Sequence, residues 1–309
     1  MKRLNALAVL PHIHIQNANM ISGPLSWGFP AMTAFLGAVH RLFRESDFPF
    51  EAAGVGVVCH GFWPQASRAP GNFIHALHLN RFPVDEKGSA ASVIEEGRAH
   101  LEITLVLGIA GELETEAEGP KWAEEMGERL QGMSIAGGSV LPCGRQPAWH
   151  PLPDALSEQR EVFRNIRYRL LPGFALLERR DLLLEHLDEM RKVRPEAGEV
   201  DALLDLCRIN WEVEPDPDNP DRGIWTARRR EGWLAPIPVG FRALSSLYDP
   251  GSVRNARDRE TPFRFVESLY TLGEWKSPHR LSSPHDLLWQ YHDDENAGLY
   301  LCTQQGDSI

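Results

Sequence analysis

Cysteine is scarce in this chain, with 4 residues among 309. None of the four belongs to a CxxC pair, and they lie far apart at Cys59, Cys143, Cys207 and Cys302. Zinc sites and disulfide frameworks both need cysteines at close or paired spacing, so this distribution argues against both. It fits a protein of the reducing cytoplasm that holds no metal.

Long apolar runs are missing as well. No stretch approaches the roughly 20 residues that a helix needs to span a bilayer, and the N-terminus has no signal-peptide pattern. The hydrophobic fraction of 42% and the charged fraction of 24% are ordinary for a globular protein. We therefore expect a cytoplasmic protein of one or two domains, with no membrane partner.

Motifs of common enzymes are also absent. The sequence has no P-loop, no HExxH and no GxSxG. Residues 54–59 nearly match a dinucleotide fingerprint, but the third glycine is missing and no helix follows. The acidic cluster at residues 112–118 lacks the aspartate spacing of a calcium loop. The sequence therefore gives no motif support to a metabolic enzyme, and we expect no cofactor.

An excess of positive charge, usual in RNA-binding proteins, is missing too, because the net charge is −11. The charge is uneven, however. Residues 112–128 hold seven Glu against one Lys, whereas residues 226–264 hold eight Arg against four acidic residues. A Debye length of about 8 Å screens the distant acidic region. The chain is therefore compatible with one local basic groove, not with nonspecific RNA binding.

The apolar periodicity of the first 150 residues predicts an α+β domain. Strand patterns occur at residues 9–15, 53–59 and 100–109, and helical stripes begin at Pro30 and at Trp122. A turn at Gly137-Gly138 leads into a further strand. The order strand, helix, strand, strand, helix, strand matches the ferredoxin-like βαββαβ unit, which RNA-binding (RRM) domains often use.

The other segments predict four further features. Residues 65–96 are too long for an ordinary hairpin loop and alternate from residue 73 to 82, which predicts a projecting β-hairpin with its tip near residues 85–89. Residues 151–213 read as a helical domain, and residues 214–232 as a proline- and acid-rich linker with a basic segment. We expect residues 233–309 to pack back on the core, with helices after Thr261 and from Ser283.

The segment IQNANMISGPLSWGFP, residues 15–30, combines carboxamides, serines and an indole in a connection close to the core. Such groups suit recognition of a polar, aromatic ligand; alternatively, the Asn side chains cap a turn and the Trp fills the core. This segment resembles the IQNANxISxPLTWGFP motif of the second Csy protein of type I-F CRISPR surveillance complexes, in the Cas-five group of the RAMP superfamily.

Six later blocks resemble this family in the family's own order, across nearly the whole chain. They are GVGVVCH at 54–60, EEGRAHLE at 95–102, AGGSVLP at 136–142, RLLPGFAL at 169–176, VRNARDRETP at 253–262 and GEWKSPHR at 273–280. Each block is weak evidence alone, but the ordered set is specific.

The resemblance implies a non-catalytic subunit that binds the 5′ handle of the CRISPR RNA in antiviral defence. It implies a heterodimer with the large Csy subunit, a hairpin "thumb" that reaches the multi-copy Csy backbone subunit, and contact with target DNA only through the complex. Phage anti-CRISPR proteins are further implied partners.

The RNA-binding residues that we predict fall into two groups. Amide and turn groups would contact unstacked bases, and arginines would hold phosphates. If residues 254–259 form a helical turn, Arg254 and Arg257 share one face of it, and Asn255 and Arg259 share another. The predicted residues are Gln16, Asn17, Asn19, Trp27, Arg81, Arg98, Gly137, Gly138, Ser139, Arg254, Asn255, Arg257 and Arg259. The arginines at 254–259 have a structural alternative, an ion-pair network with Asp258 and Glu260.

Two other functions stay open from the sequence. The first is a CRISPR-RNA-processing endoribonuclease of the same superfamily, because twelve histidines offer acid–base groups, among them His12, His14, His60 and His100. The second is a metabolic enzyme with a ferredoxin-like domain, for which no motif is present. Cleavage of precursor repeat RNA separates the endoribonuclease from a binding subunit.

Overall fold

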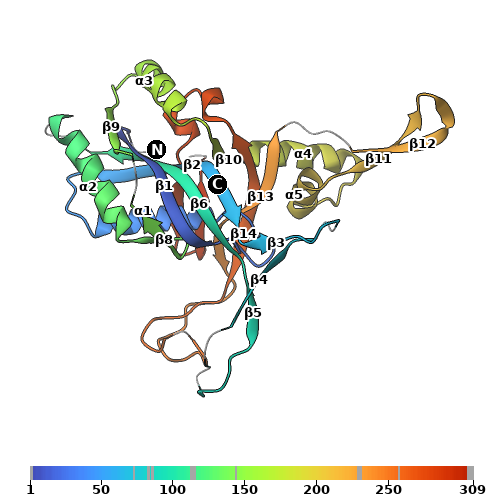
Figure 1. The fold of residues 1–309 in the computed structure, drawn as a ribbon, viewed down its shortest axis with the longest axis horizontal. Coiled ribbons are helices and arrows are strands. Elements are labelled where there is room, and N and C mark those ends of the chain that lie inside the picture. Colours follow the sequence, from blue (N-terminus) through green and yellow to red (C-terminus); the bar gives the residue numbers. More distant parts are fainter. Residues whose placement is uncertain are drawn as a thin grey trace.

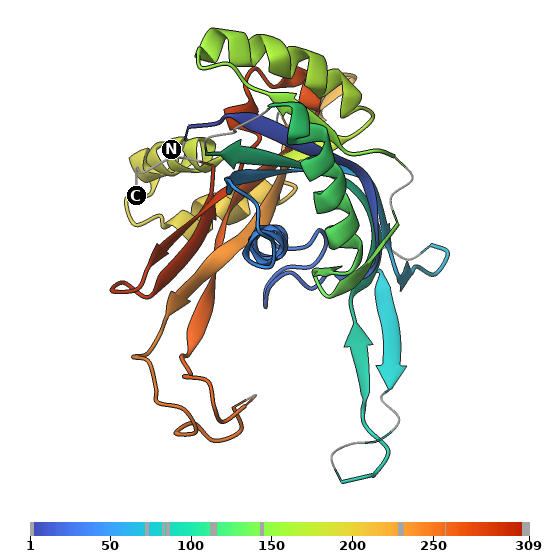
Figure 2. The same cartoon turned by 90° about the vertical axis from the view of Figure 1, so that its left-hand side faces the viewer.

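The computed structural model describes residues 3–71, 74–81, 84, 87–111, 116–142, 145–227, 232–256 and 258–304. Within these ranges the fold is α+β, as predicted, with five α-helices around one large, curled antiparallel sheet (Figure 1, Figure 2). Its main path has the order β15-β16-β13-β14-β10-β2-β6-β1-β8-β7, and β9 also pairs with β1.

Three long strands form the centre of the sheet: β1 (Ala6–Asn19), β2 (Glu51–Pro64) and β6 (Arg98–Ala110). β6 lies between the other two and is antiparallel to both. They contain the strands predicted at residues 9–15, 53–59 and 100–109. The shorter strands β8 (Gly138–Leu141) and β9 (Ala148–Pro151) pair with β1 on its other side, and β7 (Ser134–Ile135) pairs with β8.

The helices α1 (Met32–Arg44) and α2 (Gly119–Gln131) cover one face of these strands. Their apolar stripes supply fully buried residues such as Phe35 and Met126, which pack against alternate residues of β6 such as Leu105. Each fully buried side chain of this size contributes about 1.5–3 kcal/mol. Both predicted helices are confirmed, and they leave the opposite sheet face to other elements.

The opposite face is covered over only part of its length. The helix α3 (Leu156–Arg169) packs Phe163 and Ile166 against it, together with Leu287 and Leu288. Along the later half of β1 this face carries polar side chains instead, among them His12, which is bonded to Glu102 of β6. The sheet therefore presents a polar surface on the side opposite α1 and α2.

The prediction of a wholly helical segment at residues 151–213 needs a correction. α4 (Arg180–Val193) and α5 (Glu199–Cys207) are helices, but β10 (Phe174–Glu178) enters the main sheet between β2 and β14. The apolar run around Leu176 is too short for a helix and is buried between two strands. α4 and α5 pack through a separate apolar cluster that includes Leu272 of β14.

The segment predicted as a linker is a β-ribbon over most of its length. β11 (Trp211–Asp216) pairs antiparallel with β12 (Asn219–Ala227), and Asp216 Oδ1 accepts the Asp218 amide at 2.9 Å in the turn. The acidic and proline-rich composition thus belongs to a hairpin turn rather than to a flexible connection. The basic residues Arg228, Arg229 and Arg230 lie outside the described part of the chain.

Both helices predicted near the C-terminus are wrong. The chain after Thr261 forms β14 (Val266–Lys276), which pairs with β13 (Trp233–Ala243) and β10. Ser283 begins only a single 3₁₀ turn, and β15 (Gln290–Asp294) and β16 (Leu299–Thr303) follow. The helical spacing of Leu287, Leu288 and Tyr291 was misleading because Trp289 is buried and its indole donates to the Leu176 carbonyl at 2.9 Å.

The hairpin predicted between residues 65 and 96 projects from the body (Figure 2). It consists of β4 (Ala76–Arg81) and β5 (Val93–Glu96), with the short β3 (Ala66–Ser67) beside β4. The long connection between β13 and β14, residues 244–265, extends from the same end of the molecule in that view. Of the predicted tip, Asp85 and Glu86 lie outside the described residues.

Candidate functional site

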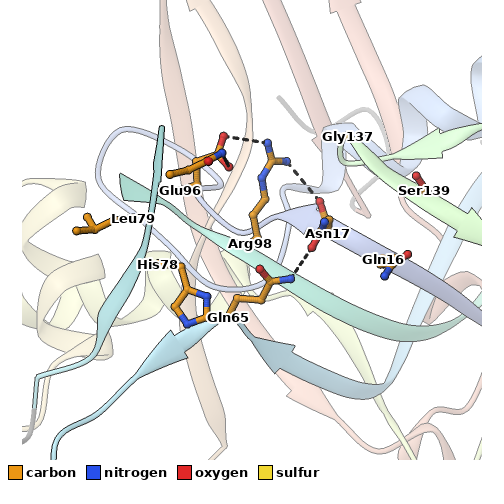
Figure 3. Close-up of a pocket in the computed structure, with 10 residues that line it drawn as sticks. Gln16, Asn17, Gln65, His78, Leu79, Glu96, Arg98, Gly137 and Ser139 are labelled. Atoms are coloured by element: carbon orange, nitrogen blue, oxygen red, sulfur yellow. Dashed lines mark hydrogen bonds and ion pairs between the residues drawn. The ribbon is translucent and has the colours of Figure 1, made fainter. Parts of the chain in front are cut away.

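A polar cavity of about 510 Å³ lies where the projecting hairpin joins the central sheet (Figure 3). It draws residues from β1, from the base of the hairpin, from the start of β6 and from the β7–β8 turn. The lining residues are Gln16, Asn17, Gln65, His78, Leu79, Asn80, Glu96, Arg98, Gly137 and Ser139. Five of the predicted RNA-binding residues therefore meet in one place, although they come from three separate blocks of sequence.

Asn17 is the centre of this arrangement. The pairing of β1 with β6 shifts register between Ile15 and Ala18, and Asn17 adopts a φ of 60° in this bulge. Its backbone N–H donates to His100 Nδ1 at 3.3 Å, and its carbonyl accepts from Arg98 Nη1 at 3.3 Å. The Gln65 amide donates to Asn17 Oδ1. Asparagine tolerates left-handed backbone well, so the bulge turns its amide into the cavity.

The Gly137-Gly138 turn forms the opposite wall. Ala136 and Gly137 both have positive φ, 50° and 71°. A Cβ on Gly138 would lie 2.7 Å from the backbone of Ala18 and of Gln16, so only glycine lets this turn approach β1. The same approach allows Asn19 N–H to donate to the Ala136 carbonyl at 2.8 Å. These glycines act through backbone geometry rather than by offering a side chain.

The charges in the cavity are arranged as a short chain. Arg98 Nη2 lies 3.4 Å from Glu96 Oε1, and Asn80 Nδ2 donates to Glu96 Oε2 at 3.0 Å (Figure 3 shows the Arg98 contacts). The Asn80 amide and then the Arg98 guanidinium lower the pKa of Glu96. Arg98 is one-third exposed, and it projects between Glu96 and Asn17. The cavity thus offers a cation, a carboxylate and several amides within one space.

A cluster of histidines continues from the cavity along the polar sheet face. His12 and His60 stack with ring centroids 4.2 Å apart, and His12 Nδ1 lies 2.6 Å from Glu102 Oε1. The bond from His12 lowers the pKa of Glu102. His60 bonds the Pro172 carbonyl through Nδ1 at 2.6 Å and Thr104 Oγ1 through Nε2 at 2.7 Å. Burial lowers the pKa of His60, which favours its neutral form.

Two other residues of the amide-rich segment lie outside the cavity lining. Asn19 bonds the backbone of Ile21 twice, with Oδ1 accepting at 3.1 Å and Nδ2 donating at 2.9 Å. Trp27 is 58% exposed on a loop that Tyr270 holds through the amide of Leu25. The segment therefore divides into a cavity part, residues 16–17, and a separate loop.

The arginine block lies on the long connection between β13 and β14. The described part of residues 254–259 forms turns rather than the expected helical turn, and Asn255 has a φ of 60°. Arg254, Asn255 and Arg259 are exposed, while Asp258 Oδ1 accepts the amides of Glu260 and Thr261. Arg257 and the side chain of Arg81 lie outside what the structure describes.

Sequence reasoning missed half of the cavity lining. The missed residues are Gln65, His78, Leu79, Asn80 and Glu96. All five belong to the two ends of the projecting hairpin, so the predicted thumb was itself a signal that polar residues at its base would face β1. Among the described residues, no cluster of His, Cys, Asp and Glu is arranged to hold a metal ion. Nor is any helix in the described ranges long and apolar enough to cross a membrane.

Comparison with known proteins identifies the family of this chain. The family model described as CRISPR-associated protein (Cas_Csy2) matches residues 8–302. The chain is also 47% identical to CRISPR-associated protein Csy2 of Pseudomonas aeruginosa (strain UCBPP-PA14), over 96% of this chain and 94% of that protein. The resemblance found in the ordered sequence blocks is confirmed: the chain belongs to the Csy2 family of CRISPR-associated proteins.

Proposed function

We propose that this protein is the RNA-binding, non-catalytic subunit of a type I-F CRISPR RNA-guided complex, and that it holds the 5′ handle of the CRISPR RNA. Membership of the Csy2 family supports its place in a Csy complex. The single observation that carries the RNA assignment is the polar cavity, where three family-like blocks converge on one space of about 510 Å³.

The cavity has the chemistry that an unstacked base requires. Carboxamides donate and accept hydrogen bonds at once, which matches the mixed edge of a nucleobase, and Gln16 and Asn17 supply two of them. Arg98 provides a planar guanidinium for a phosphate or a base face, and Glu96 can accept from exocyclic amino or ring N–H groups. The exposed arginines Arg254 and Arg259 supply phosphate contacts on the neighbouring connection.

The central strands support a ferredoxin-like interpretation of the fold. The chain runs β1, α1, β2, β6, α2, β8, and these strands lie in the order β2-β6-β1-β8 with antiparallel neighbours. α1 and α2 cover one face, and the other face is partly open and polar. In RNA-binding domains of this topology the open face carries the nucleic acid. We assign the same role to this face here.

The partners follow from the same proposal. The protein would pair with the large Csy subunit, place the projecting hairpin against the multi-copy backbone subunit, and reach target DNA only through the assembled complex. Phage anti-CRISPR proteins that act on this complex would be further partners. We assign His60 a structural role, since its two ring nitrogens bond the Pro172 carbonyl and Thr104 Oγ1.

Gln16 offers the sharpest test, because it lines the cavity, is exposed, and lies on a confirmed strand. The variant Gln16→Ala should keep the melting temperature of the parent, since exposed amides contribute little to stability. Discrimination between the correct handle and base-substituted handles should fall by roughly 1–3 kcal/mol, the value of one good base contact. The measurement is competition binding of labelled handle RNA to the chain co-purified with its partner subunit.

Gln131→Ala is the matched control, because Gln131 is an exposed glutamine at the end of α2, which covers the opposite sheet face. Unchanged discrimination in Gln16→Ala would remove the cavity from the RNA site. Incubation with precursor repeat RNA tests the remaining alternative. Cleavage that depends on His12 or His60 would identify an endoribonuclease instead.

A further inference from the structure

The ribbon formed by β11 and β12 stands apart from the rest of the fold. It forms a two-stranded sheet of its own and extends away from the body beside α5 (Figure 1). An isolated two-stranded ribbon is marginally stable in water, so an exposed one calls for a reason. Within the sheets that the structure describes, neither strand pairs with any other element.

The ribbon has one strongly apolar face. Residues directly opposite in an antiparallel pair share a face, and the register pairs Val213 with Trp225 and Trp211 with Ala227. Trp211, Val213 and Trp225 therefore lie on one side, with exposed fractions of 59%, 55% and 66%. We call these three residues the tryptophan face. The other side carries Glu212 and Glu214, opposite Thr226 and Ile224.

Further exposed apolar side chains lie on α5 and in the connection from α5 to the ribbon. Val200 and Leu204 are one helical turn apart and are 68% and 60% exposed, while Ile209 in the connection is 71% exposed. A concentration of exposed large apolar side chains marks a site that another molecule covers. Tryptophans at the centre of such a surface are the residues that most often carry binding energy.

The ribbon leaves α5 in a defined direction. Asn210 Nδ2 donates to the Asp205 carbonyl at 3.4 Å and to Asp205 Oδ1 at 3.2 Å. Asp205 also holds His186 of α4 at 2.9 Å and Arg208 at 2.7 Å. These bonds tie Asn210, the residue before the ribbon, to both helices. Ordering of the base before binding reduces the entropy that the arm loses on binding.

Charge around the tryptophan face indicates which class of macromolecule covers it. The face itself is uncharged, and acidic residues border it: Glu212 and Glu214 lie on the reverse side of the ribbon, and Asp216 and Asp218 lie at its turn. The three arginines at 228–230 follow the ribbon in the sequence but lie outside the described residues. The acidic border disfavours a polyanion, although tryptophans can stack on bases. It complements a protein surface whose apolar groove has a basic rim.

We infer that the tryptophan face, extended by Val200, Leu204 and Ile209, is a docking arm for another protein subunit of the complex, one that presents an apolar groove lined by Lys or Arg. The inference rests on the proposed place of the chain in a multisubunit complex. It adds the surface and the chemistry of the contact, and it is independent of the RNA cavity.

Site-specific crosslinking tests which class of molecule lies on the arm. A photoreactive benzoylphenylalanine replaces Trp225 in the full complex, co-expressed with the other Csy subunits and CRISPR RNA. The expected product is a covalent adduct with a protein subunit. The matched position is Ile224, which lies on the opposite face of the ribbon and should give a much lower yield of the same adduct. An adduct with RNA, or equal yields at the two positions, would overturn the inference.

The energetic test uses Trp211→Ala with Trp225→Ala, compared with Ile224→Ala with Thr226→Ala on the other face. Because the two tryptophans are exposed, the melting temperature of the isolated chain should be unchanged. Affinity for the partner subunit should fall by about 30-fold or more, the usual effect of removing a central anchor. Asp218→Lys, at the exposed turn that borders both faces, should weaken binding and reduce its salt dependence.

RNA retention separates this inference from the proposed function. If the tryptophan variants lose the protein partner but bind handle RNA normally, the arm is a protein-docking surface. If they assemble with full retention of every subunit, the docking arm is refuted while the RNA cavity stands. If the unmodified chain enters no complex at all, the proposed function and the docking arm fail together.

Discussion

Asn17 and Asn19 are two positions apart on β1, yet their side chains have different surroundings. Asn17 sits in the bulge with a φ of 60° and lines the cavity, whereas both polar atoms of Asn19 bond the backbone of Ile21. The first arrangement is what a ligand-binding amide needs, and the second is that of a turn cap. The two amides of one motif should therefore have separable effects.

We predict opposite results for two substitutions. Asn17→Gly keeps the left-handed backbone accessible while it removes the amide, so the melting temperature should change little and handle discrimination should fall by roughly 1–3 kcal/mol. Asn19→Ala removes a cap, so the free energy of unfolding should fall by about 1 kcal/mol with discrimination intact. Urea unfolding and competition binding on both variants decide this; the reverse pattern would exchange the two roles.

His60 makes the fold sensitive to mild acid. Its pKa in the folded protein lies below the ordinary 6.5 because of burial, so the unfolded chain takes up its proton first as the pH falls. The contribution of His60 to stability is complete above pH 6.5 and is lost as the pH falls through the lower folded pKa. Burial shifts the pKa of His150 and His285 in the same direction.

We therefore expect the urea midpoint to fall from pH 7.5 to pH 5.5, and the fall to be smaller in His60→Gln. Glutamine can donate to one of the two groups that His60 bonds and accept from the other, but it does not titrate. The control Gln131→Ala removes no titratable group and should keep the pH dependence of the parent. Equal slopes in parent and His60→Gln would show that the titration lies elsewhere.

At the scale of elements, the connection between β13 and β14 carries the exposed arginines. Changing Arg254, Arg257 and Arg259 to Ala should weaken handle binding and flatten its dependence on salt. Each lost phosphate contact lowers the slope of log K against log salt by about 0.7 for a single strand, or about 0.9 for a duplex. Affinity measured at four salt concentrations gives the slope. Arg160→Ala, at an exposed arginine on α3, serves as the control. If the triple variant lowers affinity but leaves the salt slope unchanged, the three arginines have a structural role and do not contact phosphates.

The projecting hairpin exposes apolar side chains away from the core. Leu79, Val93 and Ile94 have exposed fractions of 68%, 48% and 39%, whereas Leu77 at the base packs against the main core. The outer part of β4 and β5 therefore contributes little to folding. In the proposed function Val93 and Ile94 contact the neighbouring backbone subunit, while Leu79 also lines the cavity.

We predict that Val93→Ser with Ile94→Ser leaves the melting temperature within error, because exposed substitutions change stability by less than about 0.5 kcal/mol. Incorporation beside the backbone subunit, measured by native mass spectrometry of the co-expressed complex, should fall. Replacing residues 79–94 by a short glycine linker should also leave a folded chain. Aggregation of that deletion would show that the hairpin belongs to the core.

For the molecule as a whole, local patterns predicted the first 150 residues better than the rest. The apolar patterns of β1, β2, β6, α1 and α2 match residues that the structure buries, so pattern and structure agree. β10 was missed because an apolar run of four residues between two helices has no local feature that marks it as a strand. The strand conformation of β10 is determined by its pairing with β2 and β14, which lie far from β10 in the sequence.

The same cause explains the errors near the C-terminus and in the candidate site. Leu287 and Leu288 have helical spacing, yet burial of Trp289 against Leu176 and Val55 determines their conformation. Motif resemblance located Gln16, Asn17, Arg98 and the glycine turn, because these lie in the family blocks. The sequence could not predict that Glu96 and Asn80 line the cavity, because this depends on where the hairpin base lies relative to β1 in the folded chain.

The sheet is completed by segments that are synthesised late, and this has a consequence for folding on the ribosome. One edge of β2 is covered by β10 and by the bridge between Val55 and Trp289, both supplied by much later segments. At a synthesis rate of about 5–20 residues per second, that edge stays uncovered on the ribosome for on the order of tens of seconds. An unpaired apolar strand is a template for aggregation during this time. Nascent chains interrupted before Trp289 should therefore be substrates for chaperones, and full-length chains should not.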